Sequence, residues 1–431
     1  MFLILKTYFL QEDISNEAFN MKRANYLVKL KKILLLILAI LIYSNSSANT
    51  FLSKIILTDS SQPKLIGTQV SILEDKSNSL TYEKILNSSD FLSSNTLVPN
   101  LGVTNNTYWI KFSITNTSKH SELILEVAQP TLENIELYTP INDRKYIKMA
   151  LGINKKYNKR FYDNQNYLFK INLAPNSTKT FFLKLNSRDQ VMLPIYLGTS
   201  QVILESLTKR DLIFGLFLGT LITMLLYNLF IYYSVSDKIY LYYVFYILLI
   251  ILVQGSLQGY TFRFVWPQYF LLEKLSIFIF PAIADIGVIV FSMVFLNTKN
   301  LLPNYHSLLK IFIVILSISV ILALVKLYNA SFNAMQLSTI FASFTLLFIS
   351  IKLVNQGYRA ARFFLISWSF LLTGAIIFVL KDFGILPYNL FTSYSLEIGS
   401  ALEVLLLSFA LADKINIYKK EKEVSQAATL S

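Results

Sequence analysis

Residues 212–234 read LIFGLFLGTLITMLLYNLFIYYS, the first of seven apolar runs between Asp211 and Asp413. Each run holds about the twenty apolar residues that a helix needs to cross a bilayer. The polar joints between them are too short to cover such surface in a water-soluble core. The sequence therefore predicts an all-α membrane domain of seven helices over residues 210–413. The runs are Leu212–Ser234, Ile239–Gly259, Tyr269–Asn297, His306–Tyr328, Ser331–Val354, Ala361–Leu380 and Phe391–Ala412.

The composition excludes several classes of protein. Hydrophobic residues make up 54% of the chain, which is typical of a membrane protein. The net charge of +13 would suit a nucleic-acid binder, but no basic patch interleaved with aromatic residues is present. Basic residues on the cytoplasmic flanks of membrane helices account for the charge more simply. We therefore expect a lipid bilayer, and no nucleic acid, as a partner.

Cysteine is absent, and His120 and His306 are the only histidines. These counts exclude a disulfide framework and thiolate chemistry, and they argue against a histidine-ligated metal or a histidine-based catalytic centre. No nucleophile and base stand in a catalytic pattern elsewhere. We predict no enzyme activity, no catalytic residue, no metal and no cofactor.

The start of the chain has the features of an export signal. A basic head at Met21–Arg23 precedes the apolar run Ile33–Tyr43 and the small residues Ser46–Ala48. This order predicts a signal peptide over residues 21–48, cleaved after Ala48, with residues 1–20 as an untranslated upstream extension. The alternative is an uncleaved helical anchor, for which the apolar run is short.

Residues 49–209 show a different pattern, with short alternating segments separated by turns rich in Asn, Ser and Thr. Alternation with a period of two predicts strands, and many short strands with regular turns predict an exported all-β domain, an antiparallel sandwich. About 160 residues are enough to bury a core of their own. The clearest expected strands are Trp109–Thr115, Leu123–Val127, Ile135–Tyr138 and Thr180–Leu185.

Four aromatic residues of this domain are candidates for ligand binding. Trp109, Tyr157, Tyr162 and Tyr167 could stack on a sugar ring. For Trp109 a place in the core is the favoured alternative, because its neighbours alternate as those of a buried strand do.

Basic residues set the expected topology. If the sandwich is exported, the cytoplasmic joints and tail carry ten Lys and Arg residues, and the external joints carry four. This bias favours an inner-membrane protein with a periplasmic N-terminal domain and a cytoplasmic helical tail over residues 414–431. Lys209 and Arg210, just outside the first run, oppose the rule. The ten are Lys238, Lys299, Lys310, Lys352, Arg359, Arg362, Lys414, Lys419, Lys420 and Lys422; the four are Arg263, Lys274, Lys326 and Lys381.

Polar residues inside the apolar runs are candidates for signalling. A charge near the bilayer centre costs about 2.5–3.5 kcal/mol on insertion scales. The presence of Asp285, Glu397 and Glu403 in these runs therefore indicates a structural or functional role. They could join helices in a state-dependent way, with Asn228, Gln254 or tyrosine hydroxyls as partners. Static hydrogen bonds between helices and a proton pathway are the alternatives.

Two further patterns concern packing and the cytoplasmic side. Arg359 and Arg362 fall on one helical face and could hold a lipid phosphate or a cytoplasmic partner, although anchoring at the membrane surface is the favoured account. Gly255 and Gly259 form a small-xxx-small pattern that is consistent with close helix packing.

Several motifs, taken in order, resemble the bacterial seven-transmembrane receptors with diverse intracellular signalling modules. The motif of the last run is the most specific of them. The matching stretches are Trp109–Phe112 with Asn116, Leu193–Gly198, Phe214–Gly219, Leu226–Phe230, Gly357–Leu365 and Glu397–Lys414.

The resemblance implies a jelly-roll external domain, similar to carbohydrate-binding modules, and a membrane domain that relays a signal to a catalytic module. No kinase or cyclase motif precedes Ser431, so we expect output through a separate kinase or cyclase-type protein, or a truncated gene. The predicted function is a signalling receptor for a small ligand such as a carbohydrate. A transporter or channel with an external capture domain is the alternative, although no internal repeat supports it.

Overall fold

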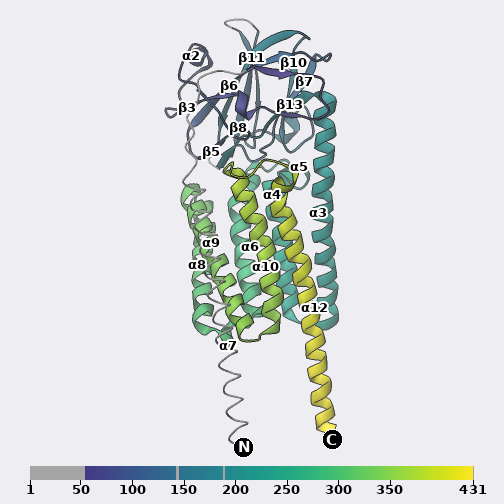
Figure 1. The fold of residues 1–431 in the computed structure, drawn as a ribbon. Coiled ribbons are helices and arrows are strands. Elements are labelled where there is room, and N and C mark those ends of the chain that lie inside the picture. The colour runs from purple at the N-terminus through teal and green to yellow at the C-terminus, as the bar shows by residue number, and fades with distance from the viewer. Residues whose placement is uncertain (1–53, 142–144, 188–189, 431) are drawn as a thin grey trace, which may run out of the picture. The chain divides into compact units, whose positions relative to one another are not determined.

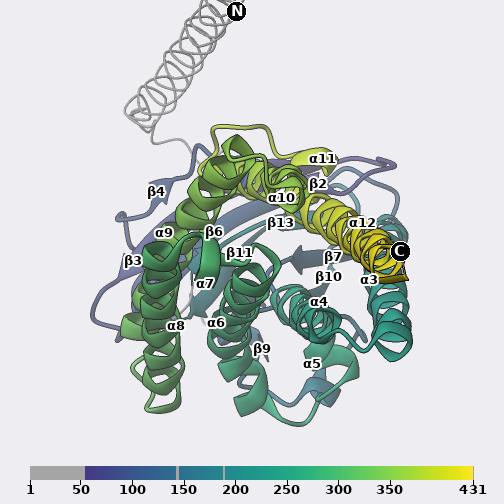
Figure 2. The same ribbon diagram turned by 90° about the horizontal axis from the view of Figure 1, so that it is seen from below.

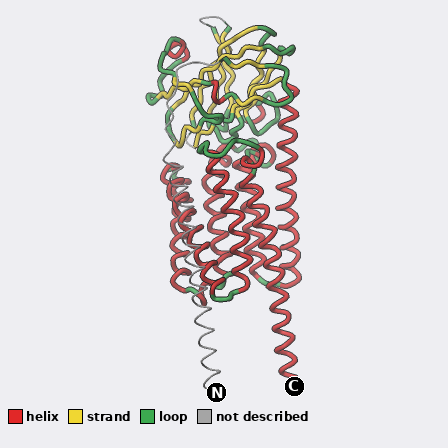
Figure 3. The backbone as a smooth tube through the Cα atoms, in the orientation of Figure 1, coloured by secondary structure: helices red, strands yellow, loops and turns green. Residues whose placement is uncertain are grey.

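The computed structural model describes residues 54–141, 145–187 and 190–430, and the fold is drawn in Figures 1 and 3. The expected upstream extension and signal peptide, residues 1–48, lie outside the described residues. Strands occupy the first part of the described chain, and helices occupy the rest.

Seven helices of the described residues are long and apolar enough to cross a membrane, which confirms the predicted seven-helix domain. They are α3 (Ser200–Val235), α4 (Lys238–Leu257), α6 (Phe270–Phe295), α8 (Pro303–Leu324), α9 (Tyr328–Asn355), α10 (Arg359–Asp382) and α12 (Ser395–Leu430). Short helices lie in three of the connections: α5 (Tyr260–Phe264), α7 (Thr298–Leu301) and α11 (Leu390–Ser393).

The seven helices form a closed ring in chain order, seen from below in Figure 2. Each helix packs against the next, and α12 closes the ring by packing against α3 as well as α10. The first and last helices of the domain are therefore direct neighbours.

Helix α3 begins at Ser200, well before the predicted apolar run at Leu212. Its first turns carry Ile203 and Leu207, which are buried against Ile124 and Leu168 of the β domain. An apolar-run criterion misses these turns because only one face of them is apolar. The result is one helix of 36 residues that belongs to both domains.

The β domain is a sandwich of two main sheets, which confirms the predicted fold class. The larger sheet has the order β4-β3-β6-β11-β8-β9, with β1 beside β6, and the smaller has the order β10-β7-β13-β2. A third sheet pairs β12 with β5. The strands are β1 (Ile55–Leu57), β2 (Lys64–Leu65), β3 (Ser71–Asp75), β4 (Leu92–Ser93), β5 (Asn100–Val103), β6 (Thr107–Asn116), β7 (Glu122–Val127), β8 (Asn134–Pro140), β9 (Tyr146–Leu151), β10 (Tyr167–Asn172), β11 (Ser177–Asn186), β12 (Gln190–Met192) and β13 (Ile195–Thr199).

Alternation along the strands builds the sandwich core, as the sequence predicts. Phe112 of β6 and Phe181 of β11 stack with ring centroids 5.8 Å apart and face Leu125 and Phe169 of the smaller sheet. One pairing differs from the expected antiparallel pattern: β1 runs parallel to β6 over the last residues of that strand.

The outer face of the larger sheet carries a second, smaller core. The short helix α2 (Tyr82–Leu86) covers this face, and Tyr82 stacks on Tyr138 at 5.2 Å. The same cluster contains Trp109 and Phe182, and Trp109 is 0% exposed. Trp109 is therefore a core residue, which is the alternative that the alternating pattern around it favoured.

Candidate functional site

A charged pair joins the smaller sheet to α3. Glu126 of β7 is 0% exposed, and its Oε2 lies 2.5 Å from Nη2 of Arg210 on α3. Asn166 donates a second hydrogen bond of 2.6 Å to Oε1 of the same carboxylate. Two donors, one of them cationic, compensate for the burial of this charge.

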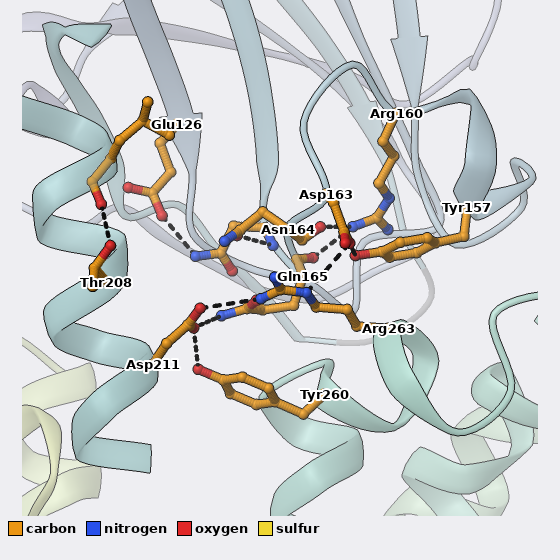
Figure 4. Close-up of polar contacts among 12 residues, drawn as sticks. Glu126, Tyr157, Arg160, Asp163, Asn164, Gln165, Thr208, Asp211, Tyr260 and Arg263 are labelled. Atoms are coloured by element: carbon orange, nitrogen blue, oxygen red, sulfur yellow. Dashed lines mark hydrogen bonds and ion pairs between the residues drawn. The ribbon is translucent and has the colours of Figure 1, made fainter. Parts of the chain in front are cut away.

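The next residue of α3, Asp211, is the centre of a polar network that Figure 4 shows. Its carboxylate accepts hydrogen bonds from Tyr260 (2.6 Å) and Gln165 (3.1 Å), and Arg263 lies 3.1 Å away. Arg263 also pairs with Asp163 of the sandwich at 3.3 Å. Burial and the adjacent Asp211 carboxylate raise the pKa of Tyr260 far above its usual value, so the phenol keeps the proton that it donates.

Aromatic packing supports this network from the side of α5. Tyr157 meets Phe262 edge-on with ring centroids 5.5 Å apart. The Arg160 guanidinium lies over Tyr157 at 4.5 Å and over Tyr167 at 4.8 Å, within the range of cation–π attraction. Arg160, Tyr157 and Tyr167 of the sandwich thus support one another at the place where the sandwich meets α5.

A second contact joins the start of β8 to α6. Glu133 and Lys274 form an ion pair of 2.9 Å, and both side chains are largely buried. Nearby, Gly259 has a φ of 75°, and a Cβ there would lie 2.5 Å from Cβ of Pro130 in the sandwich. Gly259 therefore allows a close approach to a sandwich loop and is not part of the helix-packing pattern expected from the sequence.

Inside the bundle, three tyrosines on one face of α4 form hydrogen bonds with α12. Tyr240 donates to the Leu411 carbonyl at 2.7 Å, and Tyr243 donates to the Val404 carbonyl at 2.5 Å. The hydroxyl of Tyr246 lies 3.1 Å from both oxygens of Glu403, which is 0% exposed. Tyrosine hydroxyls are therefore partners of an intramembrane carboxylate, as hypothesised.

The other intramembrane polar residues have separate partners. Asn228 of α3 donates to Ser408 of α12 at 2.9 Å rather than to a carboxylate. Glu397 accepts from Gln258 at 2.7 Å, and Thr339 of α9 contacts Asp285 of α6. Asn228 and Ser408 thus join α3 to its ring neighbour α12, whereas the other two contacts join helices that do not follow one another in the ring, α4 with α12 and α6 with α9.

At the opposite end of the bundle from the sandwich, Arg359 of α10 pairs with Asp413 of α12 at 2.8 Å. Arg362 lies one turn further on and is exposed. Of the two predicted residues, Arg359 is thus the one with an ion pair to α12 among the side chains that the structure describes.

The four aromatic residues predicted to stack on a ligand lie elsewhere. Trp109 and Tyr167 are 0% exposed. The Tyr167 hydroxyl donates its hydrogen bond to the backbone carbonyls of Pro130 and Leu132. Tyr157 packs on Phe262, and Tyr162 packs on the cluster at the start of α3. We therefore assign these rings to the core and to the contact with the helices, not to a ligand rim.

Sequence reasoning missed Glu126, Asp211 and Tyr260 and treated Arg210 and Arg263 only as flanking charges. One signal could have found this site: Arg210 stands on the external flank, where basic residues are disfavoured. Its buried carboxylate partner explains the exception.

Comparison with known families gives two matches in the same order as the domains. A family model described as 7TM diverse intracellular signalling matches residues 210–414. A second, described as 7TMR-DISM extracellular 2, matches residues 67–199. No curated protein matches the chain.

Proposed function

Because the chain belongs to the family of seven-transmembrane receptors with diverse intracellular signalling modules, we propose that a small ligand, such as a carbohydrate, binds its sandwich and that the helices relay the change. The family makes the chain a multi-pass sensory receptor whose N-terminal domain is extracellular. In our proposal the membrane is the inner membrane, residues 414–431 are cytoplasmic, and the output partner is a separate protein of the kinase or cyclase type.

One observation carries the proposal: α3 is a single helix that contacts both the sandwich and α12. Its 36 residues correspond to roughly 54 Å of helix. Arg210 and Asp211 hold its outer part to the sandwich, and Asn228 holds its membrane part to Ser408 of α12. A displacement of α3 at the sandwich therefore acts on the helix that leads to residue 430.

The energetic requirement is that the ligand favours one arrangement of the helices over another. The polar network around Asp211 could switch between two such arrangements, because its hydrogen bonds can exchange partners without exposing the apolar core of either domain. Coupling between sites is typically about 1–3 kcal/mol, which corresponds to roughly 5–150-fold changes in an equilibrium. A few hydrogen bonds of this network supply energies of that size.

The first test perturbs the network and measures the tail. Asp211→Asn removes the charge that Tyr260, Gln165 and Arg263 share, so we expect amide hydrogen exchange over residues 413–425 to change by at least about fivefold. Lys170→Gln removes a partly exposed charge on β10 that pairs with Glu122 and not with the Asp211 network, so this variant is the matched control and should leave the tail unchanged. Unchanged exchange in Asp211→Asn, together with solute uptake by vesicles that contain the protein, would favour the transporter alternative.

The second test concerns topology and uses the absence of cysteine from the chain. Single cysteines at Ser60 and at Ser425 should react with a membrane-impermeant maleimide from opposite sides of the inner membrane. We expect Ser60→Cys to be labelled in cells with a permeable outer membrane and Ser425→Cys only after lysis. Labelling of both positions from one side would contradict the proposed relay across the membrane.

A further inference from the structure

We propose that a shallow depression on the outer face of the larger sheet binds a small polyhydroxylated acid, such as a sugar acid. The inference deepens the proposed function and rests on it, because it assigns the ligand site of the sandwich. The depression has a volume of about 210 Å³ and is lined by Asn134, Glu136, Lys184, Leu185 and Asn186.

The strand register gathers the polar groups of this depression. Lys184 of β11 lies directly opposite Glu136 on β8 and opposite Trp109 on β6. One pair further along, Asn186 lies opposite Asn134. Side chains two residues apart on a strand share one face, so a lysine, a glutamate and two amides stand together there.

The charges in the depression are fixed by contacts within the sandwich. Glu136 accepts hydrogen bonds from Tyr138 at 2.7 Å and from Lys148 at 3.2 Å. Burial opposes its ionisation, but these two hydrogen bonds and the charges of Lys148 and Lys184 together outweigh burial and lower the pKa of Glu136. The carboxylate therefore stays ionised and holds its position while it presents lone pairs to a ligand.

Lys184 is oriented by the indole beneath it. Its Nζ lies 5.0 Å from the centre of the Trp109 ring, and Lys148 rather than Lys184 forms the ion pair with Glu136. The Nε1 of Trp109 is buried and has no hydrogen-bond partner among the described residues. Trp109 is 0% exposed, so the indole supports the Lys184 ammonium from beneath and does not itself touch a ligand.

This set of groups matches one ligand chemistry. An ammonium binds a carboxylate strongly, and a carboxylate accepts hydrogen bonds from hydroxyls. The Asn134 amide can both donate to and accept from hydroxyls, whereas Asn186 offers its oxygen, because its Nδ2 donates to the carbonyls of Asn105 and Asn106. The volume lies below the roughly 300–1,000 Å³ of sites for drug-sized ligands, which limits the ligand to about one sugar unit. Because Trp109 is fully covered, charge and hydrogen bonds rather than ring stacking recognise the ligand.

The depression also adjoins a contact with the helices. Asn134 directly follows Glu133, whose carboxylate pairs with Lys274 of α6. The backbone at Glu133 is tightly packed, because a Cβ on Gly152 would lie 2.2 Å from the Glu133 carbonyl oxygen. A ligand that shifts the start of β8 therefore acts on the Glu133–Lys274 pair.

The test uses the full chain in nanodiscs, with D-galacturonate as the probe and D-galactose as its neutral counterpart. Isothermal titration calorimetry should show that galacturonate binds at least tenfold more tightly than galactose. Lys184→Gln should remove this preference, whereas Lys170→Gln, an equal charge change on the other sheet, should retain it. Asn134→Ala should weaken both sugars.

Each outcome bears on the site or on the relay separately. If galacturonate does not bind, or binds equally well to Lys184→Gln, the assignment of the site is overturned, and the Asp211→Asn experiment still decides the receptor function. If galacturonate binds through Lys184 and exchange over residues 413–425 changes, both are supported. Binding through Lys184 without any change in the tail supports the site and contradicts the relay.

Discussion

Replacing Arg210 with alanine is expected to destabilise the contact between the sandwich and α3 by about 3–5 kcal/mol. Glu126 is 0% exposed, so within the described part of the chain the variant leaves this buried carboxylate with Asn166 as its one remaining donor. Removing one partner of a buried pair costs more than the pair contributes, because the other charge stays away from water. Thermal unfolding of the full chain in nanodiscs should show a separate, earlier transition for the sandwich.

Two further variants test the physical cause. Lys170→Ala breaks an exposed pair with Glu122, whose carboxylate is 59% exposed, and should change the stability by less than about 1 kcal/mol. The double variant Arg210→Met with Glu126→Gln removes both charges and should recover much of the stability that Arg210→Ala loses. Equal losses in Arg210→Ala and Lys170→Ala would mean that the buried pair does not hold α3 to the sandwich.

The sequence predicts those parts of the fold that follow from local periodicity. An apolar run of about twenty residues has one stable conformation in a bilayer, the α-helix, so all seven helices could be predicted. Alternation around Trp109 likewise predicts both the strand β6 and the burial of the ring. In each case a short window of sequence contains the whole physical argument.

The contacts between the two domains could not be predicted in this way. Glu126 and Arg210 are 84 positions apart, and nothing local to either residue indicates its partner. The aromatic residues Tyr157 and Tyr162 suggested a ligand rim because aromatic rings suit both sugars and packed interfaces. Only the fold decides between these uses, since it brings α5 and the first turns of α3 against those rings.

Glycine gives the clearest example of this limit. The pattern at Gly255 and Gly259 lies within one segment and suggested a packed helix face, whereas Gly259 meets a sandwich loop. The close helix crossing lies instead at Gly374 of α10 and Gly399 of α12, whose Cα atoms meet across the interface. No motif within a single helix contains both residues.

That crossing is the basis of the second large effect, which we expect from Gly374→Ala. The new Cβ would lie 2.3 Å from the backbone oxygen of Ser395 and 3.2 Å from Cα of Gly399, so the two backbones must separate. Separation would also break the 3.0 Å hydrogen bond from the Ser395 hydroxyl to the Gly374 carbonyl. Overpacking of this kind typically costs about 1–3 kcal/mol, and here the lost hydrogen bond adds to it.

The matched control is Gly215→Ala on α3, where a Cβ would meet no atom within 4 Å. The same substitution there adds a methyl group to an open helix face. By helix propensity alone, it should stabilise the folded protein by up to about 1 kcal/mol. In mixed micelles with increasing SDS, the unfolding midpoint should therefore fall in Gly374→Ala and rise in Gly215→Ala, each relative to the unchanged protein.

Because α12 carries Glu403, Ser408 and the segment to Leu430, displacement of this helix in Gly374→Ala should also alter exchange over residues 413–425. Two variants with the same midpoint would show that α10 and α12 do not cross at backbone contact.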